Sequence, residues 1–117
     1  QSRFRRASVA SAAIGSRHKL VDMQARVDQA RLMLYRLAWL MTTDQPCRRE
    51  AAQAKVLASE TLQAVASDGM QILASYGYVA DSPMNRILRD SRLYTFGEGA
   101  NEMLRDQIAR AMGLVTR

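Results

Sequence analysis

Apolar residues recur every three or four positions along the first third of the 117-residue chain. This alternation is typical of a helix that buries one face in a bundle, and it predicts a helix over residues 4–41. Gly15 weakens the helix near its start, so a bend or two separate helices are both open there. The expected buried stripe is Leu20, Met23, Val27, Ala30, Leu34, Leu37 and Met41.

The last part of this segment, residues 32–41, is apolar on nearly every side, and only Arg36 interrupts it. A helix that is apolar nearly all round is buried on more than one side. In so small a domain, this pattern indicates a surface that a partner covers.

A turn separates this segment from a second predicted helix, residues 46–75. Thr43 or Asp44 can cap the second helix, and Pro46 suits its first turn. Gly77 is expected to end the helix in a left-handed conformation. Small residues dominate the apolar stripe, which lets neighbouring helices approach closely. The stripe is Ala51, Ala54, Ala58, Thr61, Val65, Gly69, Ile72 and Tyr76.

Two shorter helices are predicted in the last third of the chain. Ser82 directly precedes a proline, which is a start signal for a third helix over residues 83–91. The fourth helix is predicted over residues 101–112, where Asn101 suits the N-terminus by capping. Gly113 is expected to end it.

These segments fix the expected fold class. No run of alternating β-branched residues indicates a strand. The sequence therefore predicts an all-α fold, a single up-and-down four-helix bundle over residues 1–117.

Charge and composition narrow the functional classes. The formal net charge is +6, but the arginines are spread along the chain without interleaved aromatic residues, so we expect solvated helix faces and no nucleic-acid partner. The single cysteine, Cys47, excludes an internal disulfide and fits a reducing compartment. The single histidine, His18, leaves no basis for a histidine metal site or a Ser-His-Asp triad. No apolar run has the length of a membrane span.

One carboxylate, Glu98, lies between two glycines, Gly97 and Gly99, in the stretch that joins the third and fourth predicted helices. Glycine has no Cβ, so the backbone can approach a ligand closely there. A carboxylate on such a turn, beside apolar side chains, can serve as a base near neutral pH when its surroundings raise its pKa. The alternative is a plain corner between two helices with a solvated Glu98.

Six short motifs, in order from residue 20 onward, resemble those of a known family. They are Leu20-Val21-Asp22-Met23; Ala54-Lys55 with Ala58-Ser59-Glu60; Gln71-Ile72-Leu73-Ala74-Ser75-Tyr76-Gly77-Tyr78; Pro83 with Arg86, Leu88, Arg89, Asp90 and Arg92; Glu98-Gly99-Ala100-Asn101-Glu102; and Ile108-Ala109-Arg110. Together they resemble the C-terminal helical domain of the acyl-CoA dehydrogenase family. The resemblance implies that the chain is a fragment or the C-terminal domain of a larger flavoprotein.

The resemblance also implies a reaction. In that family, two hydrogens leave the α and β carbons of an acyl-CoA thioester. Glu98 would take the α-proton as the catalytic base, and the β-hydrogen would pass as hydride to bound FAD. The backbone N–H at the base helps to bind the thioester oxygen in the family, so Gly97 and Gly99 are candidate substrate-binding residues. Gly97 replaces a common aromatic residue, which would widen the acyl pocket.

Three residues are implied as cofactor contacts: Gln71, Ala100 and Arg3. Gln71 corresponds to the family's contact with the FAD of a neighbouring subunit, and Ala74 and Ser75 stand where the family has paired glycines. Ala100 stands where a flavin-contacting Thr or Ser is usual.

The N-terminal segment has two open alignments. Without gaps, Arg3 falls at the family's arginine on the FAD pyrophosphate, with Arg6 and Ala7 in place of the family's phenylalanine and glycine. Alternatively, residues 4–15 resemble the helix before that loop, and the loop is then missing.

The family further implies an electron-transfer protein as acceptor, a homo-oligomer or hetero-oligomer, and a cytoplasmic or mitochondrial-matrix location. A different class of function is also open: a non-catalytic helical assembly module, or a degenerate subunit that supports an active partner. The apolar stretch at residues 32–41 and the altered turn at Ala74 suggest it.

Overall fold

The computed structural model describes residues 14–115, and this part of the chain is all helical, without strands. The helices are α2 (Ile14–Thr42), α3 (Arg48–Leu73), the short α4 (Ser75–Tyr78), α5 (Pro83–Leu93) and α6 (Asn101–Ala111). The predicted all-α class and its four main helices are confirmed. Helix α2 begins at Ile14 and includes Gly15, and the part of the first predicted helix before Ile14 lies outside the described residues, as does Arg3.

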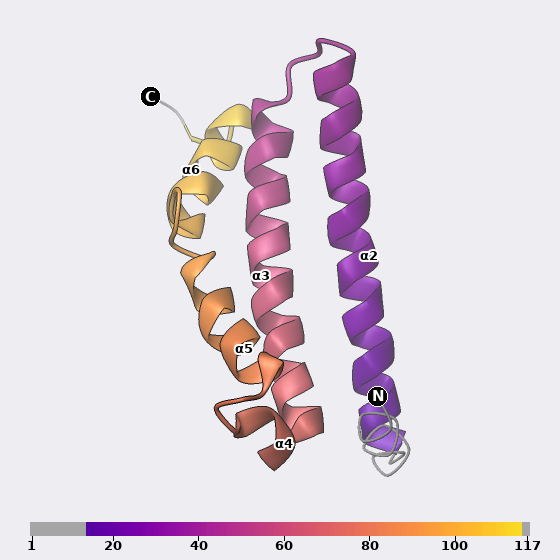
Figure 1. Ribbon diagram of the computed structural model, residues 1–117. Helices are drawn as coiled ribbons and strands as arrows, with labels where there is room; N and C mark the ends of the chain where they lie inside the picture. Colours follow the sequence, from indigo (N-terminus) through magenta and orange to yellow (C-terminus); the bar gives the residue numbers. More distant parts are fainter. Residues whose placement is uncertain (1–13, 116–117) are drawn as a thin grey trace.

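Helix α3 is the centre of the arrangement. Figure 1 shows α2 along one side of it, and α5 and α6 one after the other along the opposite side. Small residues allow this double contact. A Cβ added at Gly69 would lie 3.2 Å from the Sδ of Met84 on α5 and 3.8 Å from the Cε of Met23 on α2, so both neighbours close on the same glycine. The buried α3 residues are Glu50, Ala52, Ala54, Val56, Ser59 and Ala66.

The inward face of α2 differs from the predicted stripe at several positions. Met23, Val27, Ala30 and Leu37 are buried or half-buried, as predicted. Three predicted members are exposed: Leu20 at 52%, Leu34 at 47% and Met41 at 64%. The neighbouring residues Met33 and Leu40 face inward in their place. Because the last part of this helix, residues 32–41, is apolar nearly all round, the sequence offers two adjacent stripes there and does not decide which one faces α3.

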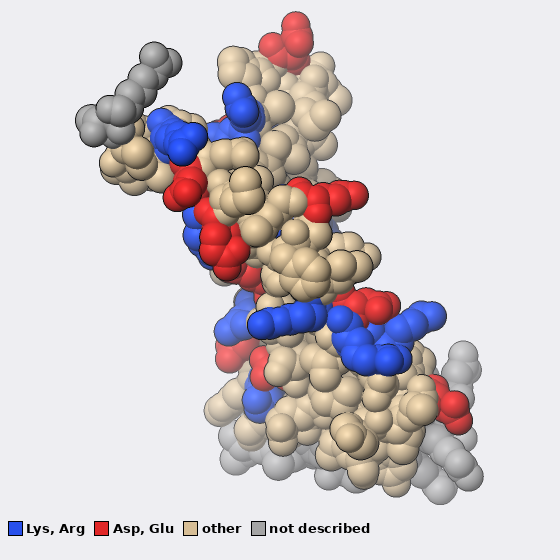
Figure 2. Space-filling model, turned by 90° about the vertical axis from the view of Figure 1, so that its left-hand side faces the viewer, with Lys and Arg blue, Asp and Glu red and all other residues tan. Residues whose placement is uncertain are grey.

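The outer face of α2 leaves large apolar side chains exposed, among them Leu32, Tyr35 and Trp39. This is the surface for which the sequence predicts a partner. Figure 2 views the α5–α6 side, where Lys and Arg lie beside Asp and Glu and do not gather into one basic patch. None of the helices in residues 14–115 combines the length and apolar character needed to cross a membrane.

The predicted start of the second helix is wrong. Helix α3 begins at Arg48, after Cys47, with no side-chain cap. Thr43 instead closes the preceding helix, since its Oγ1 donates to the carbonyl of Trp39 at 2.8 Å. Asp44 then turns the chain with a φ of 52°, ahead of Pro46. Thr and Asp occur at the C-terminal as well as the N-terminal ends of helices, because their short polar side chains form hydrogen bonds with nearby backbone groups.

The predicted left-handed cap at Gly77 is also wrong. Helix α3 ends at Leu73, and Ala74 makes the turn with φ 48° and ψ −129°. Gly77 is buried, and a Cβ there would lie only 3.0 Å from the Leu73 Cβ and the Met70 Sδ, so this glycine serves close packing. Two other signals are confirmed. Ser82 accepts the Met84 N–H at the start of α5, and Gly113 has a φ of 74° just after α6.

Candidate functional site

Glu98 lies on the loop between α5 and α6 and has an unusual backbone conformation. Its φ is 54° and that of Gly99 is 106°. Backbone hydrogen bonds close the loop; among them, the Gly97 N–H donates to the Leu93 carbonyl at 2.7 Å, and the Asn101 N–H donates to the Thr95 carbonyl at 3.0 Å. A non-glycine residue in the left-handed region costs about 1–3 kcal/mol and persists only where its surroundings enforce it; such residues are common at functional sites.

A hollow of about 450 Å³ separates this loop from α3. Glu98 and Gly97 lie on its loop side, and Ala58 and Leu62 lie on its helix side. The Glu98 side chain is exposed, so the described residues do not by themselves enclose the carboxylate. The hollow is lined by Lys55, Ala58, Ser59, Leu62, Leu93, Tyr94, Gly97 and Glu98.

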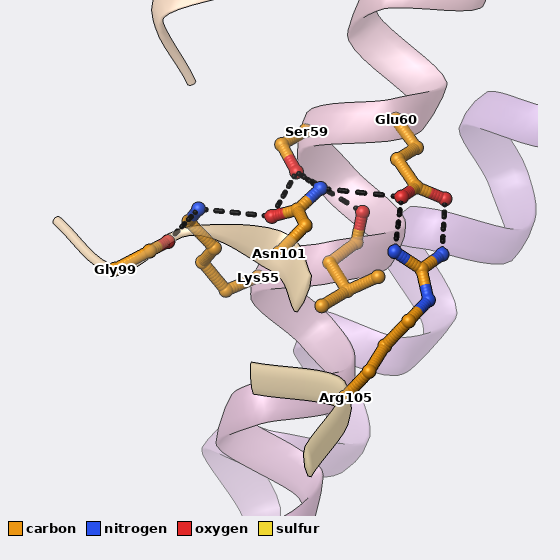
Figure 3. A network of polar contacts seen from close by, with 7 residues as sticks. Lys55, Ser59, Glu60, Gly99, Asn101 and Arg105 are labelled. Carbon is orange, nitrogen blue, oxygen red and sulfur yellow. Dashed lines mark hydrogen bonds and ion pairs between the residues drawn. The ribbon is translucent and has the colours of Figure 1, made fainter. Parts of the chain in front are cut away.

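A network of polar side chains ties the loop to α3 (Figure 3). The Lys55 ammonium donates to the Gly99 carbonyl at 2.7 Å and to the Asn101 Oδ1 at 3.0 Å. Asn101 is only 3% exposed, and its Nδ2 donates to the Ser59 Oγ at 2.9 Å and to the Glu60 Oε1 at 3.3 Å. The residue directly after the Glu98 turn is therefore fixed from two sides by one helix.

The far end of the network is an ion pair. The Arg105 guanidinium on α6 meets both carboxylate oxygens of Glu60, at 2.7 and 2.8 Å. The hydrogen bond from Arg105, with a second from Asn101, lowers the pKa of Glu60 below its ordinary value of 4.5. Glu60 therefore stays charged, which keeps it an acceptor for Asn101.

The network corrects the prediction that Asn101 caps the last helix. Asn101 is the first residue of α6, and Ala100 occupies the capping position without a side-chain bond. The Asn101 amide points to α3 instead, because the helix packs there and the buried amide finds three partners on one face.

The other predicted site residues lie in two places. Ala100 is half-buried beside Glu98, in the same loop as Gly97 and Gly99. Gln71 is exposed in the last turn of α3, roughly 20 Å along the helix from the point where the loop docks, at a rise of 1.5 Å per residue. The described residues contain no group of His, Cys, Asp and Glu side chains that could hold a metal ion.

Comparison with known proteins matches residues 2–113 to the family model of the acyl-CoA dehydrogenase C-terminal domain. The chain belongs to this family. It is 40% identical over 92 residues to benzylmalonyl-CoA dehydrogenase of Aromatoleum aromaticum, which covers 79% of this chain and 24% of that protein.

Solved structures of related proteins have the same helical fold over the matched region. Butyryl-CoA dehydrogenase from Megasphaera elsdenii superposes with a TM-score of 0.79 at 32% identity, over 81% of this chain and 25% of that one. PigA in complex with FAD gives a TM-score of 0.84 at 27% identity, over 87% of this chain and 27% of that one. The chain thus spans about a quarter of the length of these acyl-CoA dehydrogenase relatives.

Two of the family motifs meet in the network. Lys55, Ser59 and Glu60 come from the motif at residues 54–60, and Asn101 comes from the motif at residues 98–102. Reasoning from the sequence did not single out these four side chains as functional. A signal was present, because Lys55 and Ser59 are four residues apart and so share one face of a helix that is otherwise rich in small residues.

Proposed function

We propose that this chain is the C-terminal domain of an acyl-CoA dehydrogenase-like flavoenzyme that removes hydrogens from the α and β carbons of an acyl-CoA thioester. The observation that carries the proposal is the position of Glu98, on a strained turn at the edge of a largely apolar hollow. Membership of the family supports it, since the family's motif assigns the base to this residue.

In this proposal Glu98 takes the α-proton through its carboxylate. Its own backbone N–H donates to no acceptor among the described residues, so it is available for the thioester oxygen, where negative charge develops. Gly97 and Gly99 are the proposed substrate neighbours on either side of the base. A Cβ at Gly97 would lie 3.0 Å from the Leu93 carbonyl oxygen, so this glycine also allows the loop to close. Proton removal beside a thioester is feasible only if the carbonyl oxygen is stabilised while the base is in place.

FAD would supply the acceptor of the β-hydride. The exposed amide of Gln71, beside the turn at Ala74, fits a polar contact to such a cofactor. The backbone at Ala74 has a positive φ, which favours glycine, and this residue stands where the family has a glycine. The separation between Gln71 and the Glu98 loop fits the family pattern, in which Gln71 contacts the FAD of a neighbouring subunit.

The rest of the active site would come from chain outside this sequence. We expect no reduction of flavin when these 117 residues alone are mixed with FAD and an acyl-CoA. The partners proposed are an acyl-CoA substrate, an electron-transfer protein that reoxidises the flavin, and further subunits that cover the apolar outer face of α2.

The test uses the complete enzyme. Glu98→Gln keeps the shape of the side chain and removes the base, so we expect a fall of at least a thousandfold in acyl-CoA-dependent flavin reduction, with the flavin still bound. Glu102→Gln, four residues further on and also exposed, is the matched control and should reduce flavin normally. Turnover that survives in Glu98→Gln would show that the base lies elsewhere.

The second candidate is a non-catalytic assembly subunit, and the exposed Leu32, Tyr35 and Trp39 on α2 favour it. Analytical ultracentrifugation of the natural protein separates the two cases when it is combined with the Glu98→Gln assay. A non-catalytic subunit assembles through α2 and does not reduce flavin, so Glu98→Gln would not change its activity. A strict monomer at high concentration would contradict it.

A further inference from the structure

The turn that carries Glu98 is held from outside by one side chain. Glu98 and Gly99 both have positive φ, and the loop's own bonds lie before and after them, at Gly97 and Asn101. Between those two points, the contact from α3 is the Lys55 ammonium on the Gly99 carbonyl, at 2.7 Å. A strained conformation persists where its surroundings enforce it, so Lys55 is the side chain placed to enforce this one.

The second contact of Lys55 is with a rigid partner. Its ammonium also donates to the Asn101 Oδ1 at 3.0 Å. The orientation of that amide follows from its neighbours, because an ammonium only donates and the Glu60 carboxylate only accepts, so the oxygen must face Lys55 and the nitrogen must face Glu60. Lys55 thus joins a buried anchor to the strained part of the turn.

We propose that Lys55 is a positioning residue for the Glu98 base. Its two hydrogen bonds tie the Gly99 carbonyl, which belongs to the peptide between Gly99 and Ala100, to the Asn101 side chain. This sets the direction in which the carboxylate and the Glu98 N–H face the hollow. The inference rests on the proposed function, since it assigns to Lys55 an effect on proton removal. Lys55 acts through Gly99 and Asn101 and need not touch the substrate.

The test compares Lys55→Met with wild type in the complete flavin-loaded enzyme. Methionine keeps an unbranched side chain of similar length and removes both hydrogen bonds. Because a misplacement of about 1 Å can cost on the order of a hundredfold in rate, we expect kcat to fall at least tenfold while KM for the acyl-CoA changes less than threefold. We also expect the kinetic isotope effect with α-deuterated substrate to rise, because proton removal becomes the slower step.

A readout independent of turnover is amide hydrogen exchange. Without the Lys55 contact, peptides that cover residues 94–101 should exchange faster, while those of α3 remain protected. Lys19→Met is the matched control. It breaks another long-range lysine contact, with Asp68 at 3.0 Å, far from the loop. It should leave kcat, the isotope effect and loop exchange unchanged.

Lys55→Arg keeps the positive charge and the hydrogen-bond donors but presents the donors in a planar guanidinium. This variant tests the positioning role if Lys55→Met does not fold. We expect a smaller loss of kcat than in Lys55→Met, again with a raised isotope effect. Wild-type kcat and isotope effect in Lys55→Arg, and in Lys55→Met where it folds, would overturn the positioning role. Glu98→Gln, assayed alongside, separates the two proposals. If it abolishes turnover while the Lys55 variants behave as wild type, only the role of Lys55 is wrong. If it retains turnover, the proposed function is wrong.

Discussion

Within residues 14–115, Asp44, Ala74 and Glu98 are the non-glycine residues with a positive φ, and the turns at Glu98 and Ala74 are held in different ways. At Glu98, side chains from α3 reach across to the residues that follow the turn. At Ala74, the backbone bonds are local: the Ala74 N–H donates to the Met70 carbonyl, and the Ala74 carbonyl accepts from Gly77 and Tyr78. Backbone strain alone therefore does not mark a site. Strain that side chains from a distant helix maintain is the stronger sign that the local geometry matters.

The largest effect should come from removing the buried anchor of the first turn. Asn101→Leu keeps the number and branching of the side-chain heavy atoms and deprives Lys55, Ser59 and Glu60 of a partner each. An unpaired buried polar group costs about 1–3 kcal/mol, so we expect a loss of about 3 kcal/mol in the free energy of unfolding, measured by urea denaturation.

Asn85→Leu is the control from the second turn. The Asn85 Nδ2 donates to the Tyr78 carbonyl at 2.7 Å in an exposed position, where water can replace it. We expect a loss below about 1 kcal/mol. Equal losses in the two variants would mean that the long-range network contributes no more than a local bond.

The next effect concerns Gly99, whose φ is 106°. In Gly99→Ala the new Cβ has room, since its nearest neighbour is the Leu104 Cδ2 at 3.8 Å, so the cost is that of the backbone alone. We expect a destabilisation of about 1–2 kcal/mol in the same assay. Gly15→Ala, in helical backbone with nothing near the new Cβ, should instead stabilise by about 0.5–1 kcal/mol. The same sign for both variants would show that backbone strain at the Glu98 turn is absent.

These particulars show how far the sequence could predict the structure. The four main helices followed from apolar spacing, and Ser82 and Gly113 marked real boundaries. The sequence pointed to the Glu98 loop because glycines flank a carboxylate there. It did not predict the polar network between α3 and Asn101, because hydrogen bonds between residues more than 40 positions apart depend on how α6 packs against α3. The choice of the inward face of α2 likewise depends on tertiary packing, because residues 32–41 are apolar on nearly every side and do not encode that choice locally.

A smaller effect of opposite sign is expected at the second turn. Ala74 has a φ of 48° and is exposed, so Ala74→Gly removes strain without losing packing. Relief of about 1–3 kcal/mol exceeds the added entropy of an unfolded glycine, and a net gain of about 1 kcal/mol should appear in urea denaturation. A loss of stability would mean that the Ala74 methyl contributes a contact that its exposure does not suggest.

The smallest effect is a dependence on pH at the outer edge of the network. Glu60 has a pKa held below 4.5 in the folded protein, chiefly by the hydrogen bond from Arg105. A carboxylate with a depressed folded-state pKa stabilises the fold above its unfolded pKa, and this contribution disappears as the pH falls through the folded pKa. Glu60→Gln should therefore be less stable than wild type at neutral pH and should approach it in acid.

The size of this difference is limited by solvent, because the Glu60 side chain is 44% exposed. Water and salt screen such a pair, so we expect about 0.5 kcal/mol at neutral pH and less in 1 M salt. The Asn101→Leu loss should largely persist in both conditions, because the lost hydrogen bond between Asn101 and Ser59 joins two buried, uncharged side chains. If acid or salt removed the Asn101→Leu effect as well, the turn at Glu98 would be held by its exposed ion pair and not by the buried amide.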